Sequence, residues 1–565
     1  MHPTVSRPLM PAGTPFFLKT PTESPMRIDG KADMLIKGGK VITMDEPVLA
    51  RELDIAVADG RFAAVAPAGD MDGLKGPETQ VVDARGRVVM PGLIDSHNHM
   101  VLFGKQLQDV EVSPNTVSNL DELCRAIAER AAQTPPGQWV KAWGYDNTRL
   151  AENAHPTRDV LDRAAPDHPV SLMRTCMHVM AVNSKALELA SITDDQPDPE
   201  GGEFRRDENG RPNGILNELG AMSMIHKVMP LADPKECSRQ LALASEVYAA
   251  QGLTTVCEAG AGWNGNPNEA AGFQMARDQG LLRQRVCLGM METAHRLLAG
   301  DGGLGFYSGF GDGRLWLGAA KFVADGGIGA RTAAVSQAYE GSDYYGVMCE
   351  EAGSLARRMA RVHRAGWQIS VHAIGDRTID MVLDCFQKLL EDDPRPHLHR
   401  IEHAAICTPA QLERIAKLGL ALVVQPAFLH YLGDSFHENL GDHRMGLVIP
   451  VRSMLERGIM VAGSSDRPVT EGNPWTGIWS AMVRTTVGGV RISPQEAVDR
   501  VQALKMWTSS AAQLVLAKDA LGAIAPLKKA DFILIDRDPL ECAEEDVAHT
   551  KVLQTYVGGK EIFTA

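Results

Sequence analysis

QISVHAIGD (residues 368–376) lies between two stretches with helical spacing, SLARRMARVHRAG (354–366) and TIDMVLDCFQKLLEDD (378–393). The short apolar stretch predicts a buried β-strand. The apolar residues on either side recur every three or four positions, as they do in amphipathic helices. A strand between two helices indicates a parallel strand, because parallel strands need a crossover connection. This segment therefore predicts a parallel sheet with helical crossovers.

The same alternation continues toward the C-terminus. Three further apolar stretches are predicted to be strands separated by helices: HRIEHA (399–404), ALVVQPAF (421–428) and IMVAGSSD (459–466). So many consecutive units favour a closed (β/α)8 barrel over an open sheet. We place this barrel at residues 91–513.

Two capping patterns mark predicted helix starts. Thr408, followed by Pro and then by Gln411, matches a capping box in front of a helical stretch. Ser493 with Glu496 matches a second one and predicts one long helix over residues 493–515.

The two ends of the chain differ from this pattern. Residues 30–90 contain strand-like stretches with Asp-Gly and Arg-Gly turns, and residues 514–565 are similar, so we expect one small β-sandwich domain built from both ends. About 150 residues lie between the first predicted barrel strand and GLTTVCEAG (252–260), too many for one crossover, which predicts an inserted subdomain at about 105–250. Residues 1–29 carry six prolines and are predicted to form an extended N-terminal arm rather than a signal peptide.

Composition excludes several classes of partner. The net charge is −14, which argues against nucleic acid or an anionic membrane, since both attract basic surfaces. The nine cysteines contain no CxxC pair, as in proteins of reducing compartments, and no apolar run approaches the roughly 20 residues that span a bilayer. We therefore expect a cytoplasmic protein, although the charge says little about a small substrate.

PGLIDSHNHM (91–100) carries two histidines at the end of an apolar stretch. On a strand, residues i and i+2 face the same side, so His97 and His99 are expected to point into one space. Paired imidazoles are natural ligands of a divalent metal. The plainer alternative for an isolated pair is two polar residues that meet solvent at a strand end.

Further polar side chains end the other predicted strands: His372, His403 and Asp466. Active sites of such barrels lie where the strands end, so five candidates at successive strand ends favour one shared site over separate structural residues. Lys321 lies inside an apolar stretch, where an ammonium group is costly unless it is paired or chemically altered. A salt bridge to Asp325 is the plainer alternative.

These motifs together resemble the amidohydrolase superfamily, whose metal-site residues follow the order HxH, Lys, His, His, Asp. The motifs that carry the resemblance are PGLIDSHNH, AAKFVADGG, VHAIGD, IEHA and SSDRPV. GEFRRDENGRPNGIL, KFVADGGIGARTA and the long insert resemble its YtcJ-like branch, which includes N-substituted formamide deformylases. The resemblance covers about residues 33–560 and implies a distorted (β/α)8 barrel with a β-sandwich built from both chain ends.

The resemblance also implies one or two divalent metal ions, usually zinc. It implies that His97, His99 and Asp466 hold the first ion, that His372 and His403 hold the second, and that Lys321, carboxylated by carbon dioxide, bridges the two. Asp466 would then carry a proton from a metal-activated hydroxide to the leaving nitrogen. Glu402 stands beside His403, but strand alternation predicts that it points outward, so it receives no role.

The insert and one loop offer candidate substrate contacts. The insert residues are apolar or aromatic and form either a pocket wall or the core of the subdomain: Trp143, Tyr145, Met173, Met177 and Met180. His178 is a candidate hydrogen-bond donor to the substrate carbonyl or a structural residue. Arg331 is a candidate partner of an anionic substrate group or of a loop salt bridge.

The function expected from this reading is metal-dependent hydrolysis of a carbon–nitrogen bond in an amide or N-substituted formamide. The alternatives are a cyclic-amide or imide hydrolase and a deaminase; barrel deaminases of this superfamily typically use one metal and no bridging lysine, so Lys321 counts against a deaminase. A non-catalytic scaffold is disfavoured, because all six ligand positions are filled. We also expect a homodimer or a higher homo-oligomer.

Overall fold

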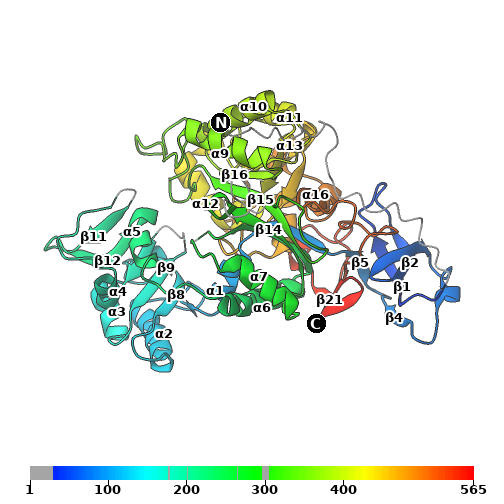
Figure 1. Cartoon of the computed structure of the whole chain (residues 1–565), viewed down its shortest axis with the longest axis horizontal. Helices are drawn as coiled ribbons and strands as arrows, with labels where there is room; N and C mark the ends of the chain where they lie inside the picture. Colours follow the sequence, from blue (N-terminus) through cyan, green and yellow to red (C-terminus); the bar gives the residue numbers. More distant parts are fainter. Residues whose placement is uncertain (1–29, 176–178, 200–201, 264, 296–304) are drawn as a thin grey trace, which may run out of the picture.

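The computed structural model describes residues 30–565 except 176–178, 200–201, 264 and 296–304, so the predicted N-terminal arm lies outside the described residues. Figure 1 shows a central barrel with a β-rich subdomain on its left and a sheet built from both chain ends on its right. This mixed α/β architecture confirms the predicted fold class.

The barrel is a parallel eight-stranded sheet in which the strands follow one another in chain order. Its strands are β6 (Leu93–Asn98), β13 (Leu253–Ala261), β14 (Arg285–Met291), β15 (Leu315–Val323), β16 (Ile369–Ala373), β17 (Arg400–His403), β18 (Ala421–Val424) and β19 (Val461–Gly463). The first and last strands are joined near their carboxyl ends. Asp466 N donates to the carbonyl of His97 over 2.9 Å, and His99 N donates to the carbonyl of Arg467 over 3.0 Å. The barrel is therefore joined by the segments that carry three predicted metal ligands, His97, His99 and Asp466.

Amphipathic helices cover the outside of the barrel (Figure 1). They include α9 (Ala352–Arg364), α10 (Asp376–Asp392), α11 (Pro409–Leu418), α12 (Ala427–Leu440), α13 (Val451–Glu456) and α14 (Pro474–Val483). The predicted capping box of α11 is confirmed: Thr408 Oγ1 accepts from Gln411 N, and Gln411 Oε1 accepts from Thr408 N. Both donors would otherwise be unpaired at the helix start.

The prediction of one long helix over residues 493–515 is wrong. The segment forms a short 3-10 turn and two separate helices, α15 (Arg500–Met506) and α16 (Ser509–Leu514). The side chains of the supposed cap bind elsewhere, since Ser493 Oγ donates to the carbonyl of Met445 and the Glu496 carboxylate accepts from Ser453. Asp499 caps α15 instead, in a capping box of its own.

Strands from both chain ends join in one eight-stranded sheet. They are β1 (Met34–Ile42), β2 (Ala50–Ala58), β3 (Arg61–Pro67), β4 (Gln80–Asp83), β5 (Val88–Pro91), β20 (Phe532–Ile535), β21 (Val552–Val557) and β22 (Lys560–Thr564). The junction is the antiparallel pair of β5 with β20. A buried ion pair, Arg285 Nε to Asp531 Oδ2 at 2.7 Å, connects this sheet to the barrel.

The insert forms a six-stranded sheet with its own apolar core. Its strands are β7 (Val110–Glu111), β8 (Val140–Tyr145), β9 (Val170–Arg174), β10 (Val179–Val182), β11 (Glu203–Arg206) and β12 (Pro212–Asn217). Helices α2 (Leu120–Gln133), α3 (Arg158–Ala164), α4 (Ser184–Leu189) and α5 (Glu218–His226) accompany them. The chain returns to the barrel through α6 (Pro234–Ala250), which packs against α1 (Met100–Gln106) and α7 (Glu269–Asp278).

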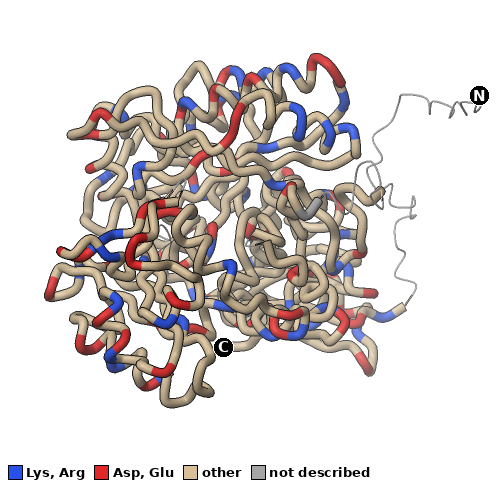
Figure 2. Tube along the Cα trace, turned by 60° about the vertical axis from the view of Figure 1, so that its left-hand side comes forward, with Lys and Arg blue, Asp and Glu red and all other residues tan. Residues whose placement is uncertain are grey.

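Figure 2 shows acidic and basic residues interspersed along the trace in that view. The eight cysteines that the structure describes are free thiols. Within the described residues, no helix combines the length and the apolar content needed to cross a bilayer.

Candidate metal centre

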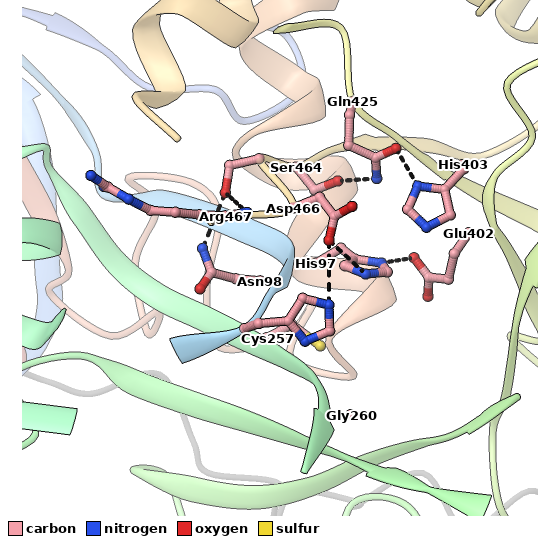
Figure 3. Close-up of polar contacts among 12 residues, drawn as sticks. His97, Asn98, Cys257, Gly260, Glu402, His403, Gln425, Ser464, Asp466 and Arg467 are labelled. Atoms are coloured by element: carbon pink, nitrogen blue, oxygen red, sulfur yellow. Dashed lines mark hydrogen bonds and ion pairs between the residues drawn. The ribbon is translucent and has the colours of Figure 1, made fainter. Parts of the chain in front are cut away.

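Three predicted ligands converge at the ends of the barrel strands. Ligand atoms of His97, His403 and Asp466 all lie within 4.8 Å of one another, and all three residues are buried. Asp466 Oδ1 lies 3.3 Å from Nε2 of His97 (Figure 3). It also lies 3.3 Å from Nε2 of His99. His403 and Asp466 have φ values of 74° and 52°, a left-handed conformation that is uncommon for such residues and that ends each strand with a sharp change of direction.

The remaining predicted ligands border this cluster. The His372 ring lies 4.5 Å from the His403 ring, centre to centre. Lys321 is buried in β15, and its ammonium group makes no hydrogen bond or ion pair with any residue that the structure describes. Burial lowers the pKa of Lys321, although the negative charges of Glu402 and Asp466 oppose the shift.

The alternative of a salt bridge from Lys321 to Asp325 does not describe this structure. The Asp325 carboxylate accepts three backbone N–H groups, from Ala334, Ile374 and Gly375. It also lies 3.5 Å from Nε2 of His372. The buried lysine is therefore left for another role.

The expectation that Glu402 points outward is wrong. Its Oε2 lies 2.6 Å from Nδ1 of His97, and the side chain is fully buried inside the barrel (Figure 3). Regular alternation would send Glu402 and its neighbour His403 to opposite faces. Because His403 leaves the extended conformation, both side chains reach the same space.

Hydrogen bonds define which ring nitrogen of His97 and His403 is free. Nδ1 of His97 donates to Glu402, and Nδ1 of His403 donates to Oε1 of Gln425 over 2.7 Å. Gln425 is oriented in turn by Ser464, whose Oγ accepts from its Nε2. In both histidines, Nε2 remains free to bind a cation.

The other two histidines are oriented in the same way. Nδ1 of His99 lies 3.5 Å from Oε1 of Glu258, whose other oxygen accepts from Met100 N at the start of α1. Nε2 of His372 donates to the carbonyl of Gly326 over 3.2 Å, which leaves its Nδ1 free. Metal-binding histidines typically donate their second N–H to a carboxylate or carbonyl, so this donor set fits a divalent ion.

The charge in the cluster also suits a cation. Burial raises the pKa of Asp466, but the nearby His97 and the hydrogen bonds from His97 and His99 outweigh it and hold that pKa well below its usual range. Burial lowers the pKa of His99, but hydrogen bonds to Asp466 and Glu258 outweigh it and raise the pKa to about 9. The site therefore holds a fixed carboxylate among imidazoles in a space with little water.

Sequence reasoning missed three residues at this site. Gln425 directly follows β18, where the rule that found the histidines would have found it too, whereas Glu258 lies inside β13, three residues before its end. Trp263 lies beside His99 with 5.5 Å between ring centres and is 38% exposed, so it offers an apolar surface next to the cluster. It comes from the loop after β13, where the sequence has no comparable signal.

The predicted substrate contacts divide into several groups. Tyr145 is fully buried in the core of the insert, with its hydroxyl 3.0 Å from Nδ1 of His155. Trp143 is half-buried, and its Nε1 has no hydrogen-bond partner among the described residues. Nε of Arg331 donates to Oδ1 of Asn439 over 2.7 Å, in place of the loop salt bridge considered. His178 and Met177 lie outside the described residues, whereas Met173 and Met180 pack in a second cluster of the insert.

Comparisons with known proteins identify relatives of this chain. Residues 80–563 match the profile of the amidohydrolase family. The chain is 30% identical to an N-substituted formamide deformylase of Arthrobacter pascens over 93% of this chain and 97% of that protein. It is 29% identical to the putative amidohydrolase YtcJ of Bacillus subtilis (strain 168), over 93% and 98%. A crystal structure of an uncharacterized metal-dependent hydrolase from Pyrococcus horikoshii OT3 superimposes with a TM-score of 0.76 at 26% identity, covering 91% of this chain and 99% of that one.

Proposed function

The chain belongs to the amidohydrolase family of hydrolases, and from this premise we propose that it cleaves the carbon–nitrogen bond of an amide or N-substituted formamide with the help of a bound divalent metal, zinc in the first instance. The observation that carries the proposal is the buried cluster of His97, His403 and Asp466. The orientation of each histidine by a second residue supports it, because that arrangement is typical of metal ligands.

The residues of the cluster have distinct roles in this proposal. His97, His99 and Asp466 would hold one ion, His372 and His403 a second, and a carboxylated Lys321 would supply anionic oxygens to both. A bound divalent ion would supply a nucleophilic hydroxide at neutral pH, since it would lower the pKa of water to about 7. Asp466 takes the proton of the attacking oxygen and delivers it to the leaving nitrogen, which departs readily only as a neutral amine.

The surroundings of the cluster suit an amide with an apolar substituent. Trp263 presents a partly exposed ring beside His99, and the relative from Arthrobacter pascens is named for N-substituted formamides. An apolar substituent would gain contact area on this ring while the carbonyl faces the histidines.

A hydrolysis screen tests the proposed function. Zinc-loaded protein is expected to release amine from at least one formanilide or acetanilide, to lose this activity to a chelator and to regain it with zinc. Cyclic imides and aryl carbamates complete the panel. Activity confined to cyclic imides or to deamination would contradict the proposed substrate class. Protein with less than about 0.2 metal per chain, with activity indifferent to chelators, would contradict metal dependence.

Metal binding is expected to strengthen as the pH rises. With a pKa of about 9, His99 carries a proton at pH 7 in the metal-free protein, and only the neutral ring can bind an ion. Affinity should therefore rise about tenfold per pH unit between pH 7 and 9, with release of about one proton at pH 7. Titration calorimetry in two buffers with different ionisation enthalpies measures this proton.

His99→Asn provides the control for this pH dependence. The variant should bind metal more weakly, because a ligand is lost, and its affinity should change less between pH 7 and 9. An affinity of the unmodified protein that does not change over this range would exclude His99 as a ligand.

A further inference from the structure

Two histidines of the cluster, His97 and His403, are each hydrogen-bonded through Nδ1 to a side chain of the same shape, but the two side chains differ in charge. Nδ1 of His97 binds a carboxylate oxygen of Glu402 at 2.6 Å, and Nδ1 of His403 binds the amide oxygen of Gln425 at 2.7 Å. All four side chains are buried. Glutamate and glutamine have the same shape, so the difference between the two supports is one negative charge.

The charge of Glu402 is held in place by its other neighbours. Arg400 Nε donates to its Oε1 over 2.6 Å, and Ser370 Oγ donates to the same oxygen. Arg400 is itself buried in the barrel, where its Nη1 donates to the carbonyl of Leu514. Because the buried Arg400 guanidinium forms an ion pair with Oε1, Glu402 is held as a carboxylate.

Gln425 is held equally firmly but as a neutral group. Its Nε2 donates to Ser464 Oγ over 2.9 Å, and Ser464 Oγ donates to the carbonyl of Val424. Since the amide nitrogen faces Ser464, the amide oxygen must face His403. The amide therefore accepts the histidine proton without adding charge.

The hydrogen-bond partners of the other two histidines do not cancel the charge difference between Glu402 and Gln425. His99 lies 3.5 Å from Glu258, and His372 lies 3.5 Å from Asp325. Each of these carboxylates already accepts several backbone N–H groups. The nearer acceptor of His372 is the neutral carbonyl of Gly326 at 3.2 Å, so His99 and His372 differ in the same sense as His97 and His403. Asp466, which lies beside His97 and His99, adds a further negative charge on their side of the cluster.

A carboxylate behind an imidazole makes the ring a more basic ligand than a neutral amide does. We propose that the two metal positions are unequal: the one served by His97, His99 and Asp466 binds its ion first and more tightly, and the one served by His372 and His403 binds later and exchanges more readily. Glu402 and Gln425 are the positioning residues that set this order. This inference rests on the proposed function, because it presumes that the cluster binds divalent ions.

The test exchanges the charge between the two supports. Metal-free protein is titrated with Co²⁺, and binding is followed by visible absorbance and by competition with a chelator of known affinity. In the unmodified protein, the first ion should bind at least about tenfold more tightly than the second. Glu402→Gln should weaken the tight position by 10–100-fold and leave the weaker one within about threefold.

Gln425→Glu is the matched variant and gives an independent result. It keeps the Arg400–Glu402 pair intact, so it avoids the unpaired buried arginine that could prevent Glu402→Gln from folding. It should tighten the weaker position by about tenfold or more and leave the tight one unchanged. Thermal unfolding of each metal-free variant, followed by circular dichroism, shows whether it is folded.

The outcomes separate this inference from the proposed function. If only one ion binds, the inference is supported when Glu402→Gln lowers the affinity for that ion and Gln425→Glu does not lower it. Equal affinities at both positions would overturn the inference. So would a tightest binding step whose affinity changes in Gln425→Glu and does not change in Glu402→Gln. Failure of the unmodified protein to bind any Co²⁺ would overturn the proposed function, and this inference with it.

Discussion

Asp466→Asn is expected to lower turnover by about 10²–10⁴-fold, the usual contribution of a general acid–base group. The carboxylate lies 3.3 Å from Nε2 of both His97 and His99, and its pKa stays well below its usual range, so it is ionised at neutral pH. The asparagine amide has nearly the same shape but cannot carry a proton between the attacking oxygen and the leaving nitrogen.

The measurement must separate proton transfer from metal loss. Turnover and metal content are therefore determined in the same sample, since the amide is also a weaker ligand than the carboxylate. Asp54→Asn is the matched control: Asp54 is a buried carboxylate of β2 in the end sheet, bound to Gly69 N and outside the cluster. It should leave turnover unchanged. Turnover of Asp466→Asn within about threefold of the unmodified enzyme, at full metal content, would refute the role of Asp466.

Lys321→Ala is expected to remove the ion held by His372 and His403 and to lower activity by roughly 10²-fold or more. The physical reason is the burial of Lys321 without a hydrogen bond or ion pair to any described residue. A free ammonium there would repel cations and meet little water, whereas a carbamate would supply two anionic oxygens.

Lys321→Glu and added bicarbonate identify the carbamate. Glutamate is also an anionic carboxylate, although its stem is shorter, so this variant should recover part of the lost activity. Bicarbonate should help the metal-free unmodified protein to regain activity with metal and should have no effect on Lys321→Glu. A crystal of active, metal-loaded protein whose density at Lys321 ends in a free amine would exclude the carbamate, and the two-metal arrangement would have to be abandoned.

Local patterns in the sequence predicted the architecture and placed candidate ligands at the ends of the barrel strands. The alternation of strands and helices between residues 354 and 466 predicts a parallel barrel, because each strand needs a crossover before the next. The capping box of Thr408 depends on residues three positions apart, so the sequence alone predicted it. His97 and Asp466 were found because polar side chains follow buried strands, and parallel strands all end at the same rim of a barrel.

Only the tertiary structure decided which side chains hydrogen-bond to the histidines of the cluster. Glu402 reaches His97 across 305 positions of the chain, and it faces inward together with its neighbour only because His403 adopts a left-handed conformation. Likewise, Ser493 and Glu496 match a helix cap in sequence, yet they bind residues of other segments, and the helix starts later. Periodicity describes neighbours along the chain, whereas hydrogen bonds in the folded barrel select partners by their position in space.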